Sequence, residues 1–215
     1  MPTHAFDSQE DGAKVEPSTG ASVHSPDDKA RSDTSTRERS RSSIQIYFGG
    51  RSFRDEALWA PVEGQFVMGS EFDWIAAGSV FGFEIGAQAS FASEDQTVGS
   101  VTIDQGASSS ELYVGPRFDS ALFGSALHLV AGVGPSFLTA GRSQEINGSR
   151  RSGSAESFGI YAHAGLIVDL GDIGLGLDYR LRGGGDMTGF EDVFGSSITG
   201  DADYGQLALT FALQF

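Results

Sequence analysis

The 215-residue sequence contains no cysteine, and its basic residues are few. Without cysteine, neither a disulfide framework nor a thiolate metal site can carry the fold. Lysine and arginine total 14 against 29 acidic residues, which gives a formal net charge of −15 at pH 7. Nucleic-acid binding needs a concentrated basic surface. The composition therefore argues against a nucleic-acid partner.

A clear membrane-helix pattern is also missing. Residues 120–141 carry no formal charge and are long enough to cross a bilayer as a helix. This segment nevertheless includes Gly132, Gly134 and Pro135, and its large residues alternate with small or polar ones. Alternation of this kind indicates a strand rather than a helix.

The first 42 residues lack both an apolar period and an export signal. They are rich in Pro, Ser, Thr, Asp and Arg, a composition that predicts a disordered polar tail or linker. A secretory signal needs an apolar run of roughly 7–15 residues, and we expect such a signal to have been removed. Residues 43–215 are expected to form one folded domain.

The end of the chain has the most regular pattern. Within residues 204–215 large apolar side chains occupy every second position: Leu207, Leu209, Phe211, Leu213 and Phe215. The positions between them hold Ala, Thr and Gln. A strand with one hydrocarbon face and one small, polar face is typical of a transmembrane β-strand with lipid outside and a narrow lumen inside.

The same alternation recurs through the folded part and predicts eight strands. The expected strands are residues 44–53, 65–75, 80–92, 111–118, 126–138, 158–170, 173–182 and 204–215. Connections after the second, fourth and sixth strands are short, whereas residues 94–110, 139–157 and 183–203 form long polar connections. This asymmetry predicts an all-β fold, an eight-stranded antiparallel up-and-down transmembrane barrel with both termini at one end.

Charged and polar residues fall on the face opposite to the apolar one. An eight-stranded barrel has an interior just wide enough for side chains, so these groups are expected to pair as a network that plugs the lumen. The predicted network consists of Arg51, Glu71, Asp73, Glu84, Arg117, His128, Tyr161, His163, Asp178, Arg180 and Arg182.

The terminal strand resembles that of bacterial outer-membrane barrels, and the whole of residues 43–215 resembles the small OmpA, OmpX and Opa-like proteins. The resemblance implies that the barrel-assembly machinery reads Phe211, Leu213 and Phe215 as an assembly signal. It also implies a location in the bacterial outer membrane, contact with outer-membrane lipid and lipopolysaccharide, and a monomeric state.

The resemblance favours a structural or surface-interaction role, with acidic external loops and no enzymatic activity. A narrow pore, a soluble lipocalin-like barrel for an apolar ligand, and a lipid A-modifying hydrolase are the alternatives. Hydrolases of that type place a Ser, a His and an acidic group toward lipid, whereas His128 and His163 are predicted to face the lumen. The histidines show no ligand spacing, so neither a metal nor a cofactor is expected.

Overall fold

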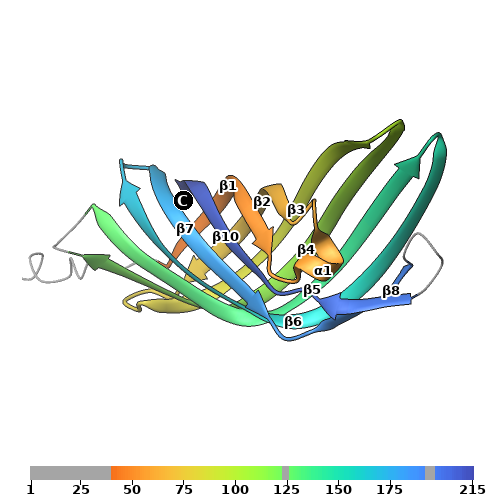
Figure 1. The fold of residues 1–215 in the computed structure, drawn as a ribbon. Coiled ribbons are helices and arrows are strands. Elements are labelled where there is room, and N and C mark those ends of the chain that lie inside the picture. Colours follow the sequence, from red (N-terminus) through yellow and green to blue (C-terminus); the bar gives the residue numbers. More distant parts are fainter. Residues whose placement is uncertain (1–39, 123–125, 192–196) are drawn as a thin grey trace, which may run out of the picture. The chain divides into compact units, whose positions relative to one another are not determined.

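The structure is a computed structural model that describes residues 40–122, 126–191 and 197–215 (Figure 1). The expected tail, residues 1–42, therefore lies almost wholly outside the described residues. The elements are β1 (Arg41–Phe53), α1 (Glu56–Trp59), β2 (Gly64–Ile75), β3 (Phe81–Val98), β4 (Val101–Leu122), β5 (Leu127–Ile146), β6 (Ser149–Asp169), β7 (Ile173–Gly183), β8 (Asp186–Glu191), β9 (Ser197–Asp201) and β10 (Tyr204–Gln214). In these parts of the chain no helix is long and apolar enough to cross a membrane.

Eight of the strands close into a barrel. The sheet runs in the order β5-β4-β3-β2-β1-β10-β7-β6, and pairing of β5 with β6 completes the ring. All neighbours are antiparallel. At the seam, Ile46 of β1 faces Phe211 of β10, and the backbones of Ser42 and Phe215 exchange two hydrogen bonds. The predicted eight-stranded antiparallel up-and-down barrel is confirmed. We call the end that holds Ser42 and Phe215 the terminal end, and the opposite end the loop end.

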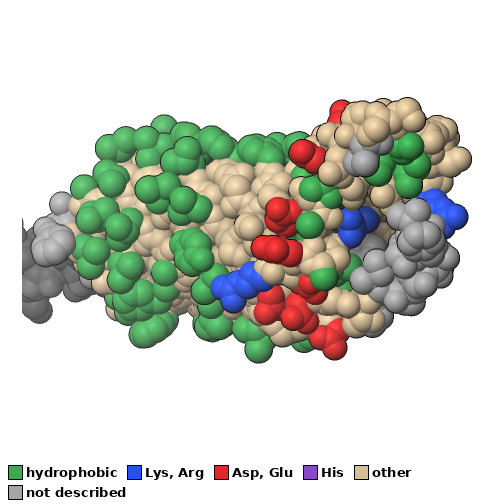
Figure 2. Space-filling model, in the orientation of Figure 1, with side chains coloured by type: hydrophobic (Ala, Val, Ile, Leu, Met, Phe, Trp, Pro, Cys, Tyr) green, Lys and Arg blue, Asp and Glu red, His purple; other side chains and the backbone are tan. Residues whose placement is uncertain are grey.

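The barrel wall is apolar outside and polar inside. Leu209 is 50% exposed on the outer face, whereas the next residue, Thr210, is 4% exposed and faces the lumen. Figure 2 shows hydrophobic side chains over one part of the outer surface and acidic side chains gathered beyond them. A hydrocarbon band of this kind is stable only against lipid. The lipocalin-like alternative requires the opposite orientation, with large apolar residues inside.

Aromatic side chains mark the terminal end of this band. Trp74 of β2 packs against Phe83 of β3 with ring centroids 5.8 Å apart, and Phe81 packs against Phe118 at 5.6 Å. Aromatic girdles at membrane interfaces have this arrangement because the rings tolerate the boundary between lipid and water. The apolar band therefore has a defined edge at the terminal end of the barrel.

Two of the expected long polar connections are regular β-structure. The pair β3–β4 continues to a tight turn at Gly99, and β5–β6 continues to Asn147 and Gly148. Both residues of the second turn have positive φ, 50° and 81°, which Asn-Gly provides at low cost. The prediction of loops over residues 94–110 and 139–157 was therefore wrong, because these segments are strands of two long hairpins. These Ser- and Gly-rich segments keep their backbone hydrogen bonds but have no lipid-facing alternation to reveal them as strands.

The loop end carries two further elements that the sequence pattern did not predict. Strands β8 and β9 form a hairpin inside the connection from β7 to β10, and β8 pairs with β6 at Glu156. Helix α1 lies in the connection from β1 to β2, where the Asp55 side chain accepts a hydrogen bond from the backbone N–H of Leu58. This N-cap satisfies one of the free amides of a helix of only four residues.

Candidate functional site: a charged lumen under a folded cap

The centre of the lumen is an arginine held between two glutamates. Arg117, on β4, donates through Nη1 to Oε1 of Glu71 at 2.5 Å and to Oε2 of Glu84 at 3.2 Å. The three residues come from β4, β2 and β3, whose inward positions meet inside the ring. All three are buried. An unpaired charge here would cost several kcal/mol, so each group depends on the others.

His163 links this centre to the opposite wall. Its Nε2 lies 2.9 Å from Oε1 of Glu84, and its Nδ1 lies 2.6 Å from Oδ2 of Asp178. Tyr161, two residues earlier on β6, donates to the same Glu84 oxygen at 2.8 Å. Both ring nitrogens of His163 are therefore engaged by carboxylates, and the ring bridges β3 and β7 across the lumen.

Arg180 lies in an aromatic enclosure beside the glutamate pair. Its guanidinium carbon is 3.9 Å from the ring centroid of Tyr113, 5.0 Å from that of Tyr161 and 5.7 Å from that of Tyr47. Its Nη2 also donates to Glu71 at 3.2 Å. Cation–π contacts of this kind strengthen when water is excluded. The rings thus help to hold a second buried guanidinium.

A second charged layer lies nearer the loop end. Arg51 forms an ion pair with Glu111 at 3.3 Å and donates to Gln206 at 3.0 Å, so it joins β1, β4 and β10. Arg182 donates to the hydroxyls of Ser136 and Ser157 at 3.0 and 3.1 Å. These contacts fill the lumen above the central cluster and tie opposite strands together.

The terminal end is closed by a histidine between two aspartates. His128 places Nδ1 2.7 Å from Oδ1 of Asp119 and Nε2 3.0 Å from Oδ2 of Asp169. Arg41 forms an ion pair with the same Asp119. One step inward, Asp73 accepts hydrogen bonds from neighbouring side chains on β1 at 2.6 and 2.8 Å. Polar contacts therefore run along the lumen from the terminal end to its centre.

The loop end is covered by an apolar cap built around α1. The Trp59 ring stacks on Phe53 with centroids 3.9 Å apart, and Leu58 is completely buried. Figure 1 shows α1 at the loop end beside the blue β8–β9 hairpin. The buried cluster comprises Phe53, Leu58, Trp59, Val62, Ala107, Leu138, Ala140, Ala155, Met187, Ala202 and Tyr204. This cluster is packed like the core of a soluble protein, and it lies outside the lipid-facing band.

Two polar contacts hold α1 in place. Arg142 of β5 donates to the carbonyl oxygen of Leu58 and, at 3.2 Å, to that of Ala60. Burial lowers the pKa of Arg142, so these carbonyl contacts compensate a charge removed from water. On the other side, the Trp59 indole donates to the carbonyl of Asp201 at 3.2 Å. The cap is therefore fastened to the barrel wall and to β9.

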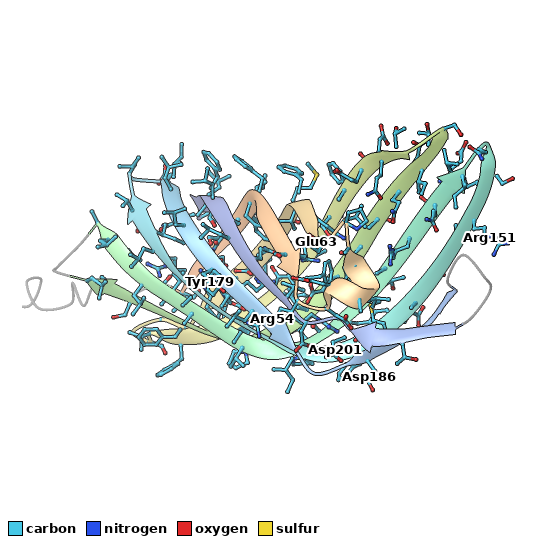
Figure 3. The ribbon with its side chains drawn as sticks, in the orientation of Figure 1. Arg54, Glu63, Arg151, Tyr179, Asp186 and Asp201 are labelled. Carbon is cyan, nitrogen blue, oxygen red and sulfur yellow. The ribbon has the colours of Figure 1, made fainter. Side chains whose placement is uncertain are left out.

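Acidic groups surround the contact between α1 and β9. The backbone N–H of Asp201 donates to Oδ2 of Asp55 at 3.0 Å. Desolvation, together with the carboxylates of Asp203, Asp186 and Asp55, raises the pKa of Asp201. Figure 3 labels Asp186 and Asp201 near each other at the loop end. This side of the cap is strongly negative.

The central cluster has the donor atoms of a metal site, but the Arg117 guanidinium already occupies the position between its carboxylates. Ligand atoms of Glu71, Glu84 and His163 lie within 4.8 Å of one another. Nη1 of Arg117, however, contacts both carboxylates, and both nitrogens of His163 have carboxylate partners. A metal ion would have to displace the guanidinium, so the geometry supports a structural ion network.

The structure places every predicted lumen residue on the inner side of the wall. Asp178 and His128 have the most exposed side chains of this set. The network also includes residues that were left out of the predicted set, although alternation places several of them on the inner face: Tyr47, Gln88, Ser90, Ser109, Glu111, Tyr113, Tyr204 and Gln206. Alternation was a sufficient signal for most of them. Glu111 shares the parity of Tyr113 and Arg117 on one strand.

The lipid-facing wall and the filled lumen define a small membrane-spanning β-barrel whose interior is occupied by its own side chains. A comparison with protein-family models found no match, and a search of curated proteins also found none. Solved structures do share the fold. The attachment invasion locus protein Ail of Yersinia pestis is 16% identical with a TM-score of 0.52, and the comparison covers 82% of this chain and 99% of Ail.

Ail in complex with the heparin analogue sucrose octasulfate matches at 17% identity with the same score and coverage. A major outer membrane protein from Thermus thermophilus matches at 11% identity, also with a TM-score of 0.52 and coverage of 82% and 99%. The fold is thus that of the small outer-membrane barrels, the class to which the sequence was expected to belong. The expected location in a bacterial outer membrane agrees with this class.

Proposed function

We propose that this chain is a non-catalytic outer-membrane barrel with a structural or surface-interaction role. The filled lumen is the observation that carries this proposal. Arg117 and Glu71 meet at its centre, and α1 covers its loop end. A barrel filled in this way can act only through its outer surface and its exposed strands.

The acidic loop end suggests which partners the exposed strands would meet. Cations bridge anionic sugars of lipopolysaccharide to acidic protein groups, and basic partners are attracted to them directly. The complex of Ail with a heparin analogue concerns a polyanionic ligand. With a net charge of −15, this chain is better suited to cationic partners or to cation-bridged lipopolysaccharide.

The terminal strand supports a further part of the proposal, namely recognition by the barrel-assembly machinery. Phe211, Leu213 and Phe215 are all exposed on the outer face of the wall. An assembly factor would therefore reach these side chains before the seam with β1 closes. We further propose that the folded barrel is a monomer.

Two measurements on the refolded protein test the proposal. In detergent, unboiled protein is expected to migrate apart from boiled protein on a gel, as a stable barrel does. In planar bilayers, the wild type is expected to show no sustained conductance. A steady conductance would favour the narrow pore. Release of acyl chains from lipid A, lost in both His128→Ala and His163→Ala, would favour the hydrolase.

A further inference from the structure

A hollow of about 660 Å³ interrupts the outer wall of the barrel. Its floor consists of small outward side chains on three neighbouring strands, Ser70 of β2, Ala87 and Ala89 of β3, and Ser110 of β4. Larger side chains border it: Ile46, Phe48, Phe66, Met68, Leu112 and Phe137. The hollow is therefore a walled depression in the lipid-facing surface.

The hollow lies toward the loop end of the apolar band. Phe66 and Phe91, which pair across β2 and β3, lie beside its floor with their ring centroids 5.4 Å apart and their planes tilted. Strand β2 starts only two residues before Phe66. The hollow thus reaches the level at which the outer face stops being hydrocarbon, the level of lipid headgroups.

A second hollow, of about 470 Å³, follows the first toward the loop end, and β4, β5 and β6 supply most of its lining. Ser108 in the upper hollow is two residues from Ser110 in the lower one and on the same face of β4, a separation of about 7 Å. The upper lining differs in chemistry, since it presents the hydroxyls of Ser108, Ser143, Ser152 and Ser154. Glycines at 106 and 141 leave room between these hydroxyls.

From this continuity we propose that the paired hollows bind one membrane glycolipid, with an acyl chain in the lower hollow and the sugar headgroup in the upper one. This inference rests on the proposed outer-membrane location. An apolar site joined to a hydroxyl-rich site across the membrane boundary matches the two halves of such a molecule.

The charges around the upper hollow favour a sugar over a phosphate. Arg142 and Arg150 both line it. The Arg142 guanidinium donates to the carbonyl oxygens of Leu58 and Ala60 in the cap, and the cross-strand neighbour of Arg150 is Glu145, which itself lies opposite Asp104. The carboxylates of Glu145 and Asp104, in the same cross-strand row, offset the guanidinium of Arg150. Serine hydroxyls and carboxylates form hydrogen bonds with sugar hydroxyls, whereas carboxylates repel a phosphate.

The test measures which lipid the folded barrel retains. The full chain is placed in nanodiscs that contain equal amounts of a glycosyl diacylglycerol, phosphatidylethanolamine and phosphatidylglycerol with identical acyl chains. Lipids that stay bound after transfer to detergent are then counted by native mass spectrometry. The glycolipid is expected to exceed each phospholipid by about tenfold.

Three variants separate the two hollows. Ala89→Phe fills the floor of the lower hollow and is expected to reduce retention of all lipids by about tenfold. Ser108→Trp fills the upper hollow and is expected to abolish the preference for the glycolipid while a chain still binds. Ala162→Phe, also on the exposed outer face but on β6 and in neither hollow, is the matched control and is expected to behave like the wild type.

Several outcomes would overturn the inference. If Ala89→Phe and Ala162→Phe retained equal amounts of lipid, the lower hollow would not bind an acyl chain. If the wild type retained all three lipids equally, the upper hollow would not bind a sugar headgroup. A dimer that Ala89→Phe disrupts would assign the hollow to a second copy. If Ala89→Phe does not fold, Ala87→Leu takes its place. A gel of unboiled protein reports insertion separately, so that failure of the membrane location is distinguished from failure of lipid binding.

Discussion

The guanidinium of Arg117 and the carboxylate of Glu71 meet inside the barrel, with Nη1 and Oε1 2.5 Å apart. Both side chains are buried. Replacing Glu71 by Ala removes one of the two glutamates that Arg117 contacts and the carboxylate that Arg180 contacts. We expect Glu71→Ala to lower the free energy of unfolding by about 3–5 kcal/mol. Urea unfolding in lipid vesicles measures this loss.

The control for that prediction is Glu94→Ala on the exposed part of β3. Removal of a solvated carboxylate there is expected to change the free energy of unfolding by less than about 0.5 kcal/mol. Equal effects of the two substitutions would mean that the lumen is wet enough to solvate its charges.

The lipid-facing orientation of the wall predicts a strong effect of charge on β10. Leu209 lies near the middle of that strand and is half exposed on the outer face. Leu209→Arg is expected to destabilise the barrel in vesicles by about 2–4 kcal/mol, because the guanidinium enters the hydrocarbon. Thr97→Arg, at the exposed tip of the β3–β4 hairpin, is the control. If both variants were as stable as the wild type in vesicles, the outer face would not contact lipid.

The contacts of Arg142 predict how firmly the cap is held. Arg142→Ala removes the donors to the carbonyls of Leu58 and Ala60, and loss of such a bond costs about 1–3 kcal/mol. Amide exchange in α1 is therefore expected to rise by about tenfold or more, while exchange in β10 stays unchanged. Unchanged exchange in α1 would show that its apolar contacts alone hold the cap.

The raised pKa of Asp201 predicts that the cap depends on pH. Because the folded state disfavours the ionised carboxylate, this group weakens the folded cap once the pH exceeds its ordinary range, and the penalty disappears as the pH falls through the raised pKa. Asp201→Asn is expected to slow amide exchange in α1 at neutral pH and to reduce its dependence on mildly acidic pH. An identical pH profile in the variant would contradict the raised pKa of Asp201, which desolvation and the neighbouring carboxylates cause.

The proposed assembly signal predicts a defect confined to cells. Phe215→Ala removes an exposed side chain that has no part in the lumen network. We expect less folded barrel in the outer membrane of expressing cells but normal refolding into detergent, as heat modifiability would show. Leu175→Ala, which shortens another outer side chain, is the control. Equal accumulation of the two variants would argue against the signal.

The sequence was sufficient to predict the barrel because lipid outside and a narrow lumen inside impose one alternation on every strand. Each of the eight strands, including β4 with its Pro116, was found in this way. Parity along each strand was enough to tell the inward positions from the outward ones. It did not identify their partners, because pairing such as that of Arg117 with Glu71 depends on which inward positions share a level in the closed ring.

Alternation could not predict the cap or the extensions of the long hairpins, and the reason is physical. Beyond the bilayer, both faces of β3–β6 meet water or other protein, so the alternation that marks a membrane strand disappears. The residues of α1 are also too few to show a helical period. Their signals were local, namely the N-cap Asp55 and the turn at Asn147 and Gly148.

The hairpin that ends at Asn147 and Gly148 stands clear of the bilayer and carries exposed residues on its turn. Loop tips of this kind tolerate insertion because few packed contacts depend on them. With the loop end outside the cell, as the resemblance to outer-membrane barrels implies, a short foreign epitope placed between these two residues should be presented at the cell surface, and the barrel would serve as a carrier for peptide display.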